Sequence, residues 1–154
     1  LVGGFVNAFA TFLGAISGNL DPQNSLAALG SLNSAGARAF NARHPQGMPT
    51  TSCGSGAAQV NGVRYYSMSG TSVLTNVLDI SDPALGAGAL FFGFEQNDGL
   101  VGRCSSRWGT VLRDDYGWNH LDEVNQFLGL RGLFASNPRS VYRAHANRLQ
   151  SLGL

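Results

Sequence analysis

The chain has 154 residues, of which 44% are hydrophobic and 12% charged, which suits one domain with a core and excludes disorder over most of the length. All ten basic residues are arginines, and nine residues are acidic. Because the arginines are scattered along the chain, the composition also argues against a basic face that binds nucleic acid.

The first twenty residues carry no charge, and apolar residues recur there at three- and four-residue steps, which predicts a helix with one apolar face. This stretch lacks the basic start of a signal peptide. Asn7 and four glycines interrupt it, so it is not expected to span a membrane, which takes about 20 apolar residues. Two interpretations stay open: a helix of the core, or an apolar flap that faces lipid.

Asp21 before Pro22 is a favourable start for a second helix. We expect that helix to break near residues 33–36 and to resume as far as Arg43. Further on, Val60-Asn61-Gly62-Val63 is a strong hairpin signal and leads into a predicted strand over residues 64–68.

Leu90-Phe91-Phe92 is short and apolar, which favours a buried strand, and the polar residues 95–99 would form the loop after it. Near the end of the chain, Ser136 or Asn137 before Pro138 predicts the start of a last helix. Apolar or weakly polar residues share one face of that helix: Val141, His145, Leu149 and Leu152.

Cys53 and Cys104 are the only cysteines, and their separation permits one disulfide across a long loop. Two buried free thiols, as in a cytosolic protein, are the alternative. The absence of a Cys-x-x-Cys pair argues against zinc-ribbon and thioredoxin-like folds.

Three histidines are available for acid–base chemistry. His44 lies beside a proline and has no obvious partner, whereas His145 lies on the apolar helix face, where a structural role is the better interpretation. His120 lies in a polar turn after an aromatic-rich stretch. A histidine in such a turn, taken alone, is still more often structural than catalytic.

Asp98 follows the predicted strand, which is where open α/β sheets place functional groups. The alternative is an ordinary Asn-Asp-Gly turn, which these residue types favour for backbone reasons. An acid after a strand, followed by His120 on a later loop, matches the second half of the Ser, Asp, His order of α/β-hydrolases.

A second set of oxygen donors surrounds this histidine in the sequence. Asp122 stands two residues after it, and Gln126 and Leu130 follow at steps of four. A helix would occupy the two carbonyls, but a looped backbone would free them. Together with Asp79, two carboxylates and two carbonyls would make a calcium-type oxygen shell, although the spacing is not that of an EF-hand.

Three separated segments are informative as motifs: residues 96–105 (QNDGLVGRCS), residues 118–126 (WNHLDEVNQ) and residues 145–149 (HANRL). In this order they resemble the secreted triacylglycerol lipases of the Pseudomonas and Burkholderia type. Residues 23–26 and 65–67 also fit, so the resemblance covers essentially all of the chain.

The resemblance implies an α/β fold in which residues 1–154 are the C-terminal portion of a single α/β-hydrolase domain, incomplete because the N-terminal half is absent. Residues 1–17 would be an apolar helix at or next to the mobile lid, which favours the lipid-facing interpretation. Asp98 would be the triad acid and His120 the general base. Cys53 and Cys104 would form the family disulfide.

The same resemblance implies a structural Ca²⁺ ion. Its protein ligands would be the carboxylates of Asp79 and Asp122 and the carbonyls of Gln126 and Leu130.

No Gly-x-Ser-x-Gly motif occurs in the chain, although the family carries its nucleophilic serine in one. We therefore expect the chain to supply part of a lipase that hydrolyses long-chain acylglycerols by a Ser-His-Asp mechanism, and to be inactive alone. The implied partners are the N-terminal half with the serine, lipid at an interface and a lipase-specific foldase, and the implied location is extracellular.

Two other functions compete with this one. The first is a non-catalytic, calcium-stabilised fragment or subunit. The second is a hydrolase that uses Cys53 as nucleophile and His120 as base, which requires that Cys53 is a free thiol.

Overall fold

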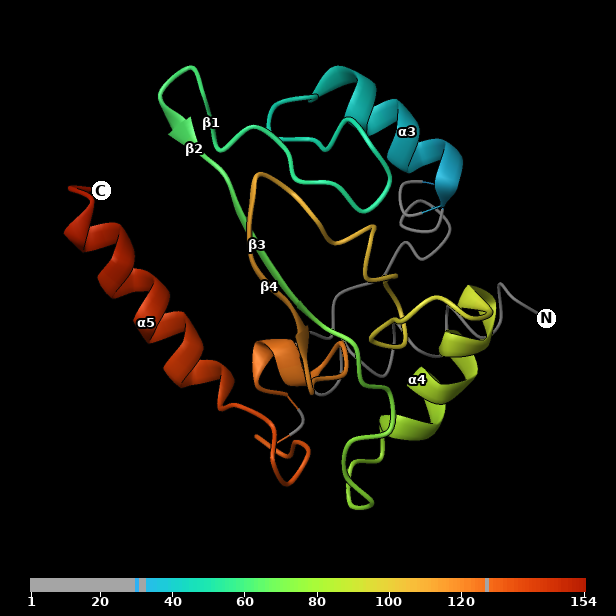
Figure 1. The fold of residues 1–154 in the computed structure, drawn as a ribbon. Helices are drawn as coiled ribbons and strands as arrows, with labels where there is room; N and C mark the ends of the chain where they lie inside the picture. The colour runs from blue at the N-terminus through green and yellow to red at the C-terminus, as the bar shows by residue number, and fades with distance from the viewer. Residues whose placement is uncertain (1–29, 31–32, 127) are drawn as a thin grey trace, which may run out of the picture. The chain divides into compact units, whose positions relative to one another are not determined.

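The computed structural model describes residue 30 and residues 33–126 and 128–154 (Figure 1). The chain divides into two compact units, Leu1–Gln46 and Gly47–Leu154. The predicted lid-adjacent helix over residues 1–17 and the predicted start of a helix at Asp21 lie outside the described residues.

In the first unit, the described helix is α3, Ser34–Arg43. Asn33 caps it, because its side-chain oxygen accepts hydrogen bonds from the backbone N–H groups of Ala35 at 3.0 Å and Gly36 at 2.9 Å. The predicted break near residues 33–36 falls at Asn33 alone, and the prediction that the helix then runs as far as Arg43 is confirmed.

The second unit begins with a β-hairpin. Strands β1, Gln59–Val60, and β2, Val63–Arg64, pair antiparallel across a two-residue turn. The turn residues Asn61 and Gly62 have φ angles of 51° and 83°, which is the left-handed backbone that an Asn-Gly hairpin turn requires. The predicted hairpin is confirmed, and the strand expected over residues 64–68 has the same length but begins two residues later, as β3, Tyr66–Gly70.

Strand β3 pairs in parallel with β4, Thr110–Tyr116. Helix α4, Asp82–Ala89, lies in the connection between the two strands, as parallel pairing requires of a crossover (Figure 1). This β-α-β arrangement agrees with the predicted α/β class. The ladder shifts register twice, so the pair is irregular toward the end at which Gly70 lies opposite Tyr116.

The prediction of a buried strand at Leu90-Phe91-Phe92 is wrong. These residues form a 3-10 helix, η1, and Leu90 and Phe91 are 82% and 74% exposed. Helical backbone continues from α4 through Ala89 and Leu90 until Gly93, whose φ of 58° ends it. A run of three apolar residues does not distinguish a strand from a helical turn, and here the preceding helix decides.

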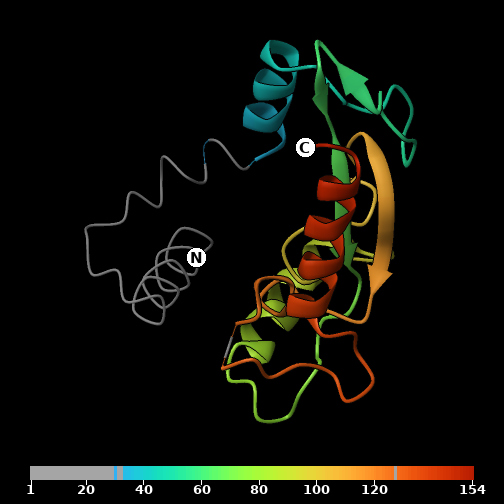
Figure 2. The same ribbon diagram turned by 90° about the vertical axis from the view of Figure 1, so that its left-hand side faces the viewer.

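Helix α5, Pro138–Ser151, starts after the N-cap Asn137, as predicted. Its residues Val141, His145 and Leu149 are half-buried, whereas Leu152, expected on the same face, is 41% exposed. The His145 ring packs edge-on against Tyr66 of β3 at 5.1 Å, and Figure 2 shows α5 running along the two paired strands. No described helix has both the length and the hydrophobicity that a membrane crossing needs.

The described part of the chain buries three large apolar side chains, those of Leu85, Trp118 and Leu121. Trp118 stacks on Tyr116 at 3.9 Å, and its indole N–H donates to the Ser136 carbonyl at 2.7 Å. This packing fixes the backbone that directly precedes His120.

Candidate active site

Asp98 lies in a tight loop that an isolated bridge between Asn97 and Gly102 closes. Its Oδ1 accepts the backbone N–H groups of Leu100 at 2.9 Å and Val101 at 2.7 Å, and the side chain is 2% exposed. The loop does not follow a sheet strand, so the geometric premise on which the sequence singled out Asp98 was wrong. The loop nevertheless holds one carboxylate oxygen and leaves Oδ2 for another partner.

That partner is His120. Its ring Nδ1 lies 2.8 Å from Asp98 Oδ2, and its backbone N–H donates to the Asp98 carbonyl at 2.9 Å. Burial opposes ionisation of both side chains, but their hydrogen bond and mutual charge outweigh it, so the pKa of His120 is raised and that of Asp98 lowered. The imidazole is 37% exposed, and Nε2 has no hydrogen-bond partner among the described residues.

The residue before the histidine holds this turn in place. Asn119 is fully buried, and its Oδ1 accepts the N–H groups of Leu121 at 2.9 Å and Asp122 at 2.8 Å. Its Nδ2 donates to Asp82 at the start of α4, at 2.8 Å. Sequence reasoning missed Asp82, because an aspartate before Pro83 is also an ordinary helix start.

Sequence reasoning also missed Glu123. Its Oε1 accepts the backbone N–H of Gly70 at 2.5 Å, at the end of β3. A side chain at position 70 would collide with the Trp118 carbonyl, so this close approach needs glycine. Burial is the main reason why the pKa of Glu123 is raised to about 7, and the nearby Asp98 charge adds to it. The signal was in the sequence, because residues three apart on a helical turn share a face, and Glu123 is three residues after His120.

Glu95, in the loop before Asp98, is not one of the carboxylates gathered at His120 among the described residues. Glu95 accepts the backbone N–H of Cys104 at 3.2 Å. In contrast, Glu123, Asp98 and His120 each offer a candidate metal-binding atom, and these atoms lie within 4.8 Å of one another. This three-residue cluster can hold a metal ion, although an ion on Nδ1 would displace the hydrogen bond to Asp98.

A second acidic pair lies beside this cluster. Asp79 and Asp122 are buried, and each has one carboxylate oxygen with no hydrogen-bond partner in the described part of the chain, Oδ2 of Asp79 and Oδ1 of Asp122. Burial, with the charges of Asp79 and Asp82, raises the pKa of Asp122 to about 6. Unpaired buried carboxylate oxygens are rare in folded proteins, and a bound cation is one of their ordinary explanations.

The backbone after Asp122 is looped, as the predicted calcium shell requires. The 3-10 helix η2 covers Asp122–Val124, and Asn125 and Leu128 then adopt left-handed φ angles of 58° and 54°. Among the described residues, no backbone N–H donates to the carbonyl of Gln126 or of Leu130. Both carbonyls are therefore free of the helical ladder that would have excluded them as ligands.

Cys53 and Cys104 form a disulfide with a Cα–Cα separation of 4.4 Å, so this prediction is confirmed. The bond leaves Cys53 no free thiol, which is why the alternative of a Cys53–His120 hydrolase is wrong. The other two histidines contact aromatic rings, His44 at 4.7 Å from Phe40 and His145 at 5.1 Å from Tyr66.

The chain is similar to proteins named triacylglycerol lipase. It is 53% identical to one from Vibrio cholerae over 137 residues, which cover 89% of this chain and 44% of that protein. It is 43% identical to one from Pseudomonas fragi, covering 96% of this chain and 53% of the relative. For Burkholderia plantarii the identity is 38%, over 100% of this chain and 51% of the relative. No family model matches, and the chain spans about half the length of the curated relatives it matches.

Proposed function

Because this chain is homologous to bacterial triacylglycerol lipases over most of its length, we propose that it supplies the acid and histidine of such a lipase. The substrates would be long-chain acylglycerols at a lipid–water interface. The observation that carries the proposal is the hydrogen bond between Asp98 Oδ2 and His120 Nδ1, together with a histidine Nε2 that has no other partner in the described part of the chain.

In this mechanism, His120 Nε2 takes the proton of a serine that lies in the part of the lipase this chain does not span. Asp98 keeps the proton of the imidazole on Nδ1 and stabilises the imidazolium, without itself becoming protonated. The serine oxygen then attacks the ester carbonyl, and His120 returns the proton to the leaving alcohol. Backbone N–H groups outside this chain would hold the oxyanion.

The packing of the described residues supports an α/β-hydrolase fold that a further polypeptide segment completes. Parallel strands occur almost always in larger sheets with both faces covered, and β3 and β4 here pair only with each other among the described strands. Large apolar side chains are exposed in the second unit: Leu74, Val77, Leu78, Leu90, Phe91, Phe94, Leu128, Leu133 and Phe134. A serine-bearing N-terminal half would cover part of this surface.

A structural calcium ion fits the second acidic pair. Asp79 and Asp122 would hold it through the oxygens that lack a partner, with the Gln126 and Leu130 carbonyls as further ligands. Bound there, the ion would neutralise two buried carboxylates and tie the turn after His120 to the loop before α4. The family resemblance also suggests secretion and folding by a dedicated foldase.

A non-catalytic fragment is not favoured, because the chain's relatives are named as enzymes. The test is ester hydrolysis by the 154-residue chain, first alone and then combined with the serine-bearing half. We expect no turnover alone and turnover in the combination. His120→Ala should abolish that turnover, and His145→Ala, which removes the histidine on α5, should leave it within about twofold of the unmodified enzyme.

Two results would contradict the proposal. One is turnover by the purified chain alone that depends on His120. The other is a combination that hydrolyses esters equally well with and without His120.

A further inference from the structure

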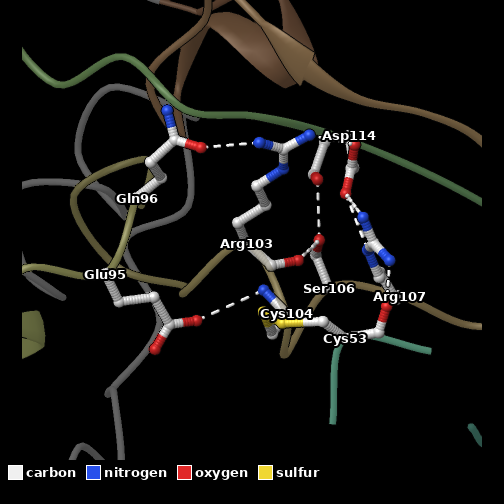
Figure 3. The surroundings of a disulfide bond; sticks show 9 residues. Cys53, Glu95, Gln96, Arg103, Cys104, Ser106, Arg107 and Asp114 are labelled. Atoms are coloured by element: carbon white, nitrogen blue, oxygen red, sulfur yellow. Dashed lines mark hydrogen bonds and ion pairs between the residues drawn. A yellow bond between two sulfur atoms is a disulfide. The ribbon is translucent and has the colours of Figure 1, made fainter.

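A network of charged residues joins the loop of Asp98 to strand β4, and nothing in the proposed mechanism uses it. Arg103 Nη2 lies 2.9 Å from Asp114 Oδ1, and Arg107 Nη2 lies 2.6 Å from Asp114 Oδ2 (Figure 3). Arg107 Nε donates to the same oxygen at 2.7 Å. Asp114 is buried in the middle of β4, so both arginines converge on a single enclosed carboxylate.

Arg103 lies at the base of the turn that carries Asp98. Its backbone N–H donates to the Gln96 carbonyl at 2.8 Å, and its Nη1 donates to the Gln96 side chain at 2.6 Å. The loop between Gln96 and Arg103 is therefore closed at both backbone and side-chain level. Because the other end of the same guanidinium is on Asp114, the position of this turn is set relative to β4.

Strand β4 leads directly to His120. Its last residue, Tyr116, stacks on Trp118, and the carbonyls of these two residues accept the N–H groups of Thr71 at 2.9 Å and Ser72 at 3.0 Å. The segment from Asp114 to His120 thus has packing and hydrogen bonds along its length. A shift of the Asp98 turn relative to β4 is a shift relative to His120 as well.

We propose that Asp114 is a positioning residue, which through Arg103 and Arg107 sets the distance between Asp98 and His120. The inference rests on the proposed lipase mechanism, in which that distance fixes the imidazole tautomer. Asp114 does not touch the histidine and acts only through the Asp98 turn. Its carboxylate is suited to this role, because hydrogen bonds from Arg103 and Arg107 hold its pKa down to about 2 and keep it ionised.

The disulfide attaches the segment around Arg103 to a second part of the chain. Cys104 follows Arg103 and is bonded to Cys53, and Arg107 donates from Nη1 to the Cys53 carbonyl (Figure 3). The disulfide joins the segment to residue 53, upstream of β3, and not to β4. Asp114 therefore adds a contact between this segment and the strand before His120 to the direct hydrogen bonds that join Asp98 and His120.

The next residue offers a matched control. Asp115 is also paired with an arginine, Arg113, at 2.6 Å, but its side chain is 51% exposed and, as the next residue of the strand, faces the opposite side from Asp114. Asp114→Asn and Asp115→Asn make the same chemical change one residue apart in β4. A third variant, Arg103→Gln, removes the ion pair with Asp114 by changing the arginine in the loop.

The experiment uses the complete enzyme, with kcat and KM for a soluble ester and the ¹H resonance of the His120 Nδ1 proton as readouts. Asp114→Asn should lower kcat by at least about tenfold with KM within about twofold, since small displacements of catalytic groups reduce rate more than binding. The proton resonance should shift or broaden. Asp115→Asn should change neither readout, and Arg103→Gln should reproduce the Asp114→Asn result.

If Asp114→Asn lowers only thermal stability, with kcat and the His120 resonance unchanged, the inference is wrong. The same holds if Asp115→Asn has an equal effect on kcat. Should Asp114→Asn fail to fold, the Arg103→Gln variant decides by the same two readouts. A complete wild-type enzyme without His120-dependent hydrolysis contradicts the proposed function instead, and the resonance then still reports whether Asp114 positions the pair.

Discussion

The structure contains two pairs of polar side chains, Asp98 with His120 and Asp79 with Asp122, and they differ in how many of their carboxylate oxygens have a hydrogen-bond partner. Asp98 has hydrogen bonds to both oxygens, from two backbone N–H groups and from His120. Asp79 and Asp122 each retain a buried oxygen with no partner among the described residues. The first pair is complete without any added group, whereas the proposed calcium ion would take up the two unpartnered oxygens of the second. The chain therefore builds its acid–histidine pair from its own hydrogen bonds, and in the proposed function an ion would complete the adjacent acidic pair.

The largest expected effect is on the first pair. In the complete enzyme, Asp98→Asn places an amide against Nδ1 and favours the wrong imidazole tautomer, which costs about 10⁴-fold in kcat in a serine hydrolase with no substitute acid. Glu123 is close enough to compensate in part, so the single variant should keep at least about ten times the kcat of Asp98→Asn/Glu123→Gln. Steady-state kinetics on the two variants and on Glu123→Gln alone measure this. Equal rates in the single and double variants would show that Glu123 does not compensate.

Removing the disulfide should loosen the Asp98 segment and leave the acidic pair intact. With a sequence separation of 51 between the cysteines, the chain-entropy model gives a loss of about 4 kcal/mol in the free energy of unfolding for Cys53→Ser/Cys104→Ser. Urea denaturation measures the loss, and reduced wild-type protein is the control that should match the variant. The rise in melting temperature on adding calcium should persist in the variant. If reduction leaves the denaturation curve unchanged, the bond does not stabilise this segment.

Calcium should act on the second pair alone. At 100 times its dissociation constant the ion should stabilise the fold by about 2.7 kcal/mol, and Asp122→Ala should lose that increment and misplace His120. Because the pKa of Asp122 is raised to about 6 and the ion needs the ionised carboxylate, the increment should grow as the pH rises through about 6. Thermal melts with calcium and with chelator, at pH 5 and pH 8, test both points. Asp115→Asn should retain the full increment, and a wild-type melting temperature indifferent to calcium and chelator would remove the case for the site.

A further effect concerns Glu123, which belongs to neither pair. Its pKa is raised from 4.5 to about 7 mainly by burial, so the folded state binds a proton that the unfolded state has already lost in that interval. The contribution of Glu123 to the free energy of unfolding of the wild type should therefore be greatest below about pH 4.5 and should fall as the pH rises toward 7. Glu123→Gln, which cannot ionise, should remove that slope. Parallel pH-dependent slopes for the two proteins, measured by urea denaturation at constant calcium, would contradict the burial effect.

The sequence by itself determined the features that depend on a few neighbouring residues. The Asn61-Gly62 turn and the Asn137-Pro138 start of α5 were predicted correctly, because the backbone angles and caps they require are satisfied locally. Asp98 and His120 were also identified from the sequence, by their order in the chain and by the motifs around them. The structure brings these two residues together at 2.8 Å.

Only the tertiary structure decided how residues 90–92 fold and which residues surround Asp98 and His120. Phe91 lies in an exposed helical turn, because helical backbone continues from α4. A run of three apolar residues does not predict whether a preceding helix continues through it. Glu123, and not Glu95, approaches His120, because Gly70 at the end of β3 passes close enough to bind it. Asp114 meets its two arginines through contacts between a loop and a strand. Such contacts depend on how distant segments pack, and the spacing of residues along the chain does not contain that information.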